Sequence, residues 1–112
     1  MFTDKKTNRT IYANLNQSVI RATLRSFDLY PTFLEVIKDT PEYTDITTNN
    51  PMLTSALADE ENVFWDSDEC TYVMVELFDA LNSYAPDGYY FGAHEGDGSD
   101  FGYWEYNEDN EY

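Results

Sequence analysis

The residues that could do chemistry are concentrated in the last quarter of the chain, in the segment GYYFGAHEGDGSDFGYWEY at positions 88–106. It contains the single histidine, His94, and all five glycines, together with four carboxylates and seven aromatic rings. Glycines flanked by polar residues occur in phosphate-binding loops, in calcium-binding loops and in ordinary turns. Spacing and charge distinguish these three types of segment.

Spacing and charge both exclude a phosphate-binding loop. Gly96, Gly98 and Gly102 do not follow the GxGxxG pattern, and no Lys-Ser or Lys-Thr pair comes after them. The carboxylates around these glycines would also repel a phosphate group.

Calcium fits the segment better, because Glu95, Asp97, Ser99 and Asp100 supply the hard oxygen ligands that this ion prefers. However, the D-x-D-x-D-G spacing of an EF-hand is absent, and the GDGSD fragment is a single copy of a motif that works as stacked repeats. We therefore expect no metal and no other cofactor, and interpret the glycines and acids as turn residues. A weak calcium-binding module is an alternative.

A catalytic role would depend on His94 or Cys70. His94 could exchange protons with Asp97 or Asp100, and His94 with Cys70 could form a nucleophilic pair. Cys70 falls on the apolar side of a predicted helix, where a cysteine fills core space. Because the chain contains no recognised catalytic motif, the sequence predicts a protein that is not an enzyme and has no catalytic residues.

The charge distribution restricts the partners that the chain can bind. Residues 1–38 hold all six basic residues and three acids, whereas residues 39–112 hold nineteen acids and no base. The first part therefore has a charge of +3 and the second part has a charge of −19, which gives a net charge of −16. Its field repels nucleic acid and anionic lipid and attracts basic surfaces. We expect a basic protein surface as partner, with no direct contact to nucleic acid or membrane.

Helical periodicity predicts the elements that position these residues. A helix over 67–85 has Ser67 as its N-cap and an apolar stripe of Cys70, Val73, Met74, Leu77, Phe78 and Leu81. Another helix is predicted with Ser26 or Asp28 as the cap of its start, and Pro41 is predicted to stop it. Further helices are predicted at 16–25 and after Asn50, which is expected to cap its helix, and residues 41–50 are predicted to form turns.

Strands are predicted at 89–93 and 101–106, where they form a hairpin that packs on the 67–85 helix and gains a third strand from residues 10–13. Residues 1–9 and 107–112 are predicted to be flexible tails of a single domain, 1–112. The predicted fold class is α+β, with three or four helices packed on a small antiparallel sheet dominated by the C-terminal hairpin.

Two candidate binding surfaces follow from this arrangement. An acidic surface would combine carboxylates of the 67–85 helix and of the hairpin loop: Asp68, Glu69, Glu76, Asp79, Glu95, Asp97 and Asp100. An aromatic surface would comprise Tyr89, Tyr90, Tyr103 and Trp104, since a two-stranded ribbon cannot bury both faces behind one helix. Alternatively, the rings build the core of a small domain and the acids only keep it in solution.

The segment APDGYYFGAHEGDGSDFGYWE, within a similar stretch over 78–105, resembles the marker of an uncharacterised family of small acidic proteins. These are encoded by phages, plasmids and other mobile elements of gut bacteria. The blocks SFDLYPTFLEVI at 26–37 and FWDSDE at 64–69 are also similar. The resemblance implies an accessory protein of a mobile element, and it assigns no role to any residue.

Together these features predict a cytoplasmic, protein-binding accessory that opposes a host defence enzyme, as an anti-restriction or anti-CRISPR inhibitor with a DNA-mimicking acidic surface. Cytoplasmic placement is expected because the chain shows no apolar secretory stretch and no apolar run near the roughly 20 residues of a membrane span. The alternative is a homo-oligomeric or adaptor module, such as a homodimer, that uses the aromatic hairpin as its interface.

Overall fold

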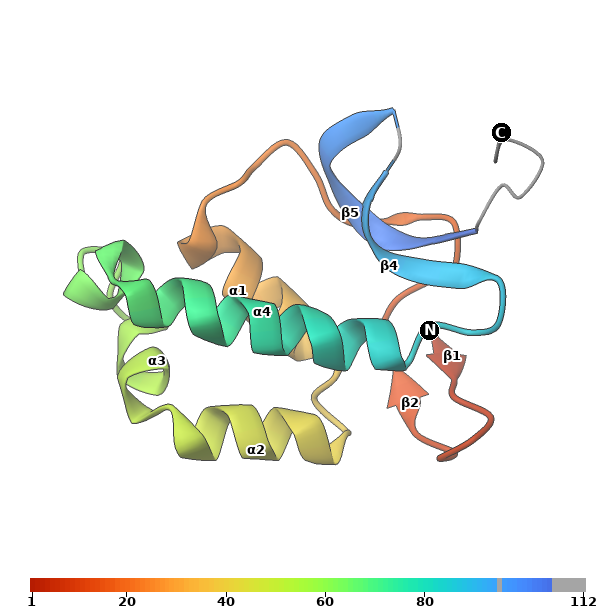
Figure 1. Ribbon diagram of the computed structural model, residues 1–112, viewed down its shortest axis with the longest axis horizontal. Helices are drawn as coiled ribbons and strands as arrows, with labels where there is room; N and C mark the ends of the chain where they lie inside the picture. The colour runs from red at the N-terminus through yellow and green to blue at the C-terminus, as the bar shows by residue number, and fades with distance from the viewer. Residues whose placement is uncertain (95, 106–112) are drawn as a thin grey trace.

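The computed structural model describes residues 1–94 and 96–105, and describes the backbone alone at residue 97. Within these residues the helices are α1 (Ser26–Val36), α2 (Pro41–Asn49), α3 (Pro51–Ala56), the short 3-10 helix η1 (Val63–Asp66) and α4 (Asp68–Ser83). The strands are β1 (Phe2–Thr3), β2 (Thr10–Ile11), β3 (Ser18–Ile20), β4 (Tyr89–His94) and β5 (Asp97–Glu105). Four α-helices pack with a small antiparallel sheet, which confirms the predicted α+β class (Figure 1).

Helix α4 is the central element, as predicted, and it crosses the front of the molecule in Figure 1 with α1 behind it. Ser67 caps the helix, since its Oγ accepts a hydrogen bond from the Cys70 N–H at 3.3 Å. Asp68 and Glu69 lie in the first turn, where negative charge stabilises the helix dipole. The predicted apolar stripe faces the core, where Cys70, Val73, Leu77 and Leu81 are buried.

Helix α1 forms where the apolar spacing predicts it, but its start differs from the prediction. Arg25 occupies the N-cap position without a side-chain hydrogen bond, and Ser26 is the first helical residue. The helix buries Leu29, Tyr30, Phe33, Leu34 and Val36. Apolar burial therefore defines this helix in the absence of a side-chain cap.

The prediction of turns over residues 41–50 is wrong, because α2 occupies Pro41–Asn49. Pro41 does not merely stop the preceding helix; it stands at the first position of the next one, where a missing N–H costs nothing. The Thr40 hydroxyl caps α2 by accepting from the Tyr43 N–H at 3.3 Å. The predicted helix after Asn50 is confirmed as α3, although the Asn50 side chain makes no cap bond and donates to the Ile46 carbonyl.

The predicted helix over 16–25 is wrong, because residues 18–20 form the strand β3. Val19 and Ile20 are β-branched, and such residues favour extended backbone when a pairing partner is present. Asn16 and Ala22, with φ of 58° and 66°, adopt left-handed conformations on either side of the strand. These two residues interrupt any helix, and they let β3 align with β5.

The third strand of the hairpin sheet is therefore β3 and not residues 10–13. The sheet order is β3-β5-β4, with Ser18 opposite Gly102. Strand β2 instead pairs with β1 in a separate two-stranded ribbon, in which Phe2 faces Ile11. Residues 1–9, predicted as a tail, thus include a paired strand, and the Phe2 ring lies 5.2 Å from the Tyr103 ring.

The C-terminal hairpin is confirmed, with Phe91 opposite Tyr103 and Ala93 opposite Phe101. Strand β5 starts at Asp97, so it includes most of the predicted loop, and the register shifts between Ala93 and His94. Residue 106 and the predicted tail at 107–112 lie outside the described residues.

The core joins α1, α4 and the hairpin through aromatic rings. The Phe33 ring of α1 lies 5.3 Å from Phe78, 5.2 Å from Phe91 and 5.6 Å from Phe101. The buried Tyr103 hydroxyl donates to the Leu81 carbonyl of α4 at 2.7 Å. The hairpin consequently packs on α4 as predicted. Of the six aromatic rings described in strands β4 and β5, three are buried in the core: Phe91, Phe101 and Tyr103.

Candidate functional site

The four acids predicted on the 67–85 helix are all exposed on α4. We call this set the α4 acidic face; its members are Asp68, Glu69, Glu76 and Asp79. Because a helix rises about 1.5 Å per residue, the first and last members are about 16 Å apart along the axis. The face is a row of carboxylates on one rigid element.

No salt bridge within residues 1–94 and 96–105 neutralises this face. The two ion pairs found there join Arg25 to Glu60 and Lys38 to Glu35. Lys5 and Lys6 line a cavity with residues 83 and 85–87, next to the C-terminal end of α4. Lys5 and Lys6 share this cavity with the acids Asp4 and Asp87, while Asp68 and Glu69 occupy the positive end of the helix dipole.

The acids predicted in the hairpin loop do not form a continuation of this face in the structure. Residue 95 and the side chain of residue 97 lie outside what is described. Asp100 is half-buried, and its Oδ1 atom is buried without a hydrogen-bond partner in the described part of the chain. Of the seven predicted acids, the structure places four together, all of them on α4.

The predicted aromatic surface is smaller than expected. Tyr103 is fully buried, so the prediction that its ring is exposed is wrong. The residue points into the core, where the Leu81 carbonyl accepts a hydrogen bond from its hydroxyl. Tyr89, Tyr90 and Trp104 are half-buried. The Tyr90 hydroxyl donates to the Ala93 carbonyl at 3.1 Å.

Trp104 is engaged within the hairpin in the same way. Its Nε1 donates to the Gly92 carbonyl at 3.0 Å, and its ring lies 4.7 Å from the His94 ring. Two of the three half-buried rings therefore make polar bonds to their own hairpin, which reduces what they can offer to a partner.

The outer edge of β4 is also occupied by the chain itself. The Phe91 N–H donates to Asn82 Oδ1 at 3.0 Å, and the Tyr89 N–H donates to the Pro86 carbonyl at 2.9 Å. Side-chain and backbone groups that bond to an edge strand oppose the addition of a strand from another molecule. The hairpin is consequently a poor edge for strand-to-strand association.

Of the residues considered for catalysis, His94 and Asp97 are opposite each other in the β4–β5 register, whereas Cys70 and His94 lie in different environments. Cys70 is buried in the core, whereas His94 is exposed and its Nδ1 accepts from the Gly96 N–H at 3.0 Å. Across the described part of the chain, no group of three or more His, Cys, Asp or Glu residues is placed to hold a metal ion.

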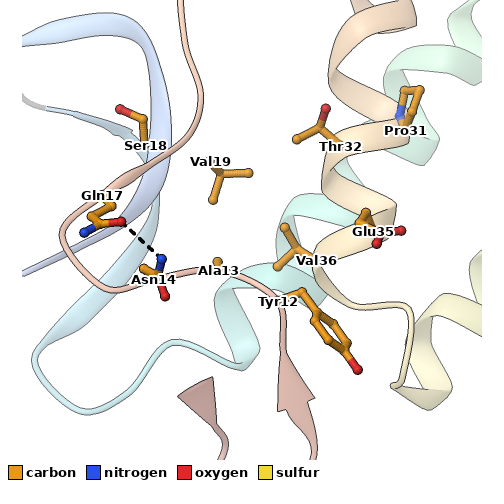
Figure 2. A pocket seen from close by; sticks show the side chains of 10 residues that line it. All are labelled: Tyr12, Ala13, Asn14, Gln17, Ser18, Val19, Pro31, Thr32, Glu35 and Val36. Atoms are coloured by element: carbon orange, nitrogen blue, oxygen red, sulfur yellow. Dashed lines mark hydrogen bonds between the residues drawn. The ribbon is translucent and has the colours of Figure 1, made fainter. Parts of the chain in front are cut away.

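A groove of about 510 Å³ lies between α1 and the segment that leads into β3, as Figure 2 shows. Ala13, Val19 and Val36 are apolar residues of its lining, and Asn14 and Gln17, which also line it, form a 3.1 Å hydrogen bond. The sequence did not predict this groove, because residues 16–25 were expected to be helical. Among its polar lining side chains, the Tyr12 hydroxyl donates to Asp39 Oδ2 and the Thr32 hydroxyl donates to the Asp28 carbonyl.

Two exposed apolar residues of α4 were also missed. Tyr72 is 67% exposed and Val75 is 56% exposed, although both lie on the most strongly patterned helix of the chain. Their three-residue spacing on the side opposite the apolar stripe is the signal that could have identified them.

Comparison with protein-family models, with curated proteins and with solved structures finds no match to this chain. No helix within the described residues is long and apolar enough to cross a membrane.

Proposed function

We propose that this chain is an acidic, non-enzymatic protein-binding accessory of a mobile element. In this role the α4 acidic face occupies a basic groove of a host nucleic-acid-processing enzyme. The observation that supports it best is the row of four exposed carboxylates on one helix, without a basic partner among the described residues. Fixed charges on a rigid element need little reorganisation on binding, which favours association with a preformed basic surface.

The proposed mechanism is imitation of DNA. A groove that binds DNA displays Lys and Arg side chains toward phosphate groups, and carboxylates spaced along a helix can meet the same cations. The net charge of −16 accelerates the approach to such a groove, and it keeps the chain away from nucleic acid itself. Restriction and CRISPR nucleases are the enzymes that a mobile element has most reason to block.

Inhibition of DNA cleavage by purified restriction and CRISPR nucleases tests this proposal. We expect inhibition near 50 mM salt that weakens steeply by 300 mM, because exposed charges are screened over about 10 Å at 0.1 M. The variant D68N/E69Q/E76Q/D79N, called the α4 charge variant, should lose this inhibition. The variant D45N/E61Q/D87N/E105Q, called the control charge variant, should retain the inhibition. It has the same net charge as the α4 charge variant, but its α4 acidic face is intact.

Equal behaviour of the two variants would show that net charge alone acts, and would contradict the role of α4. Absence of inhibition across the nuclease panel, together with no binding to a basic protein at low salt, would reject the proposal. Thermal melts of both variants check that lost inhibition is not lost folding, because Asp68 and Glu69 also stabilise the α4 dipole.

The alternative is a homo-oligomer that uses the half-buried rings of the hairpin, Tyr89, Tyr90 and Trp104. The bonds that Tyr90 and Trp104 make to their own strands, and the occupied edge of β4, weigh against it. Sedimentation at two salt concentrations separates the two proposals: an apolar dimer persists in high salt, whereas an acid-driven complex dissociates.

A further inference from the structure

The α4 acidic face has an apolar centre. Tyr72 and Val75 are three residues apart, so their side chains are neighbours on the outer surface of the helix. At 67% and 56% exposure they are among the most exposed large apolar side chains of the described residues. Neither is required for the core, which α4 contacts through its opposite side.

The carboxylates surround this pair on both sides along the helix. Asp68 and Glu69 lie four and three residues before Tyr72, and Glu76 lies four residues after it. Asp79 lies four residues after Val75. An exposed aromatic ring inside a rim of charged groups has the arrangement of a binding hot spot, in which central apolar contacts are shielded from water by a polar border.

Charge decides what can cover this surface. A second copy related by a two-fold axis would bring the same carboxylates toward one another, and that repulsion opposes self-association through α4. Nucleic acid and anionic lipid are repelled for the same reason. The suitable occupant is a protein surface that is apolar in the middle and basic at its margins.

We propose that the outer face of α4 docks a cationic amphipathic helix of a partner protein. The partner's apolar stripe covers Tyr72 and Val75, and its flanking Lys and Arg side chains meet the α4 acidic face. A helix suits this site because α4 is a straight 16-residue ridge, and helices pack side by side at interaxial distances of about 8–10 Å. This inference rests on the proposed function and specifies its partner.

The apolar centre gives the complex a property that pure DNA imitation lacks. Contacts between exposed rim charges weaken with salt, whereas burial of Tyr72 and Val75 does not. Binding should therefore fall with salt to a residual level that depends on these two side chains.

Two synthetic helical peptides of equal length and charge serve as probes. One has leucines along one face and lysines elsewhere, and the other has alanine at every leucine position. Calorimetry at low and high salt measures their Kd values for the wild type, for Y72A/V75A and for the control L24A/M52A. Alanine preserves helix propensity, and the control removes exposed apolar side chains outside α4.

We expect the wild type to prefer the leucine peptide, and Y72A/V75A to bind it about tenfold or more weakly, as loss of a hot spot does. The same variant should bind the alanine peptide as the wild type does, and L24A/M52A should behave as wild type with both. Equal affinity of Y72A/V75A and wild type for the leucine peptide would overturn this proposal.

The α4 charge variant distinguishes failure of the proposed function from failure of the docking proposal. If it binds both peptides as tightly as wild type, the proposed function fails as well. If it weakens both peptides while Y72A/V75A changes neither, the acidic face binds cations without an apolar centre, so only the present inference is wrong. Thermal melts verify that every variant is folded.

Discussion

Buried tyrosine hydroxyls show how single residues couple this fold to pH. Tyr30 and Tyr103 donate to the Cys70 and Leu81 carbonyls, and Tyr84 donates to Glu42 Oε1 at 2.5 Å. Burial is the main reason that the pKa of each phenol is raised. For Tyr84, burial and the hydrogen bond to Glu42 raise the pKa to about 12 from an ordinary 10.0.

These pKa values predict a loss of stability in alkali. Between pH 10 and 12 the unfolded chain releases the Tyr84 proton while the folded chain retains it, so the free energy of unfolding falls as pH rises. The contribution is fully present below pH 10. Urea titrations at pH 8, 10 and 11 should show declining stability, with a smaller decline in Tyr84→Phe, which costs about 1 kcal/mol at neutral pH. A flat profile would contradict this assignment.

At the scale of elements, the contact of β3 with β5 depends on the absence of a side chain at Gly102. A Cβ atom there would lie 2.5 Å from the Gln17 carbonyl oxygen and 3.1 Å from the Trp104 ring. The carbonyl belongs to the backbone that leads into β3, so it can move only if the strand moves. Gly102 therefore permits the close approach that completes the sheet.

Gly102→Ala should consequently destabilise the protein by about 1–3 kcal/mol, the usual cost of forcing an extra carbon into a packed site. The matched control is Gly98→Ala, because a Cβ at Gly98 meets no atom of the described residues within 4 Å. Thermal or urea unfolding of both variants measures the difference. Equal stability of the two variants would mean that β3 does not require this approach.

For the whole molecule, self-repulsion is the dominant electrostatic effect. The net charge is −16, and only two ion pairs, Arg25–Glu60 and Lys38–Glu35, occur within residues 1–94 and 96–105. Exposed ion pairs add little to stability, so they do not offset the repulsion among nineteen acids in the second part of the chain.

Sodium chloride should therefore stabilise this protein. Between 20 and 300 mM we expect the melting temperature to rise by roughly 5 °C, which corresponds to about 1 kcal/mol in a domain of this size. The control charge variant, which carries four fewer negative charges, should gain less. A melting temperature that falls with salt would show that attractive pairs outweigh repulsion.

Much of the helical structure was predictable because its signals are local. Ser67, the acids after it and the apolar stripe identified α4 without tertiary information. The 41–50 segment was misassigned because its Thr and Asn residues resemble turn chemistry, whereas Thr40 and Pro41 start a helix. Residues 16–25 were misassigned because the same apolar spacing fits a short helix or a strand that has a partner.

The α4 part of the candidate site was also predictable from local signals. The carboxylates on the polar side of α4 follow from helical periodicity, and the structure places all four on the surface. Which hairpin rings are buried and which are exposed could not be predicted in this way, because either face of a strand can pack on the core or face solvent. Tyr103 is buried because α4 and the Phe2 ring pack against it.

The sequence by itself determined the acidity of the second part of the chain, helix α4 and the C-terminal hairpin. Composition, capping and periodicity carry these properties, and none of them needs contacts between distant residues. Only the tertiary structure decided that β3 completes the sheet and that Tyr103 is buried. Burial depends on which elements meet, and that is a property of long-range packing.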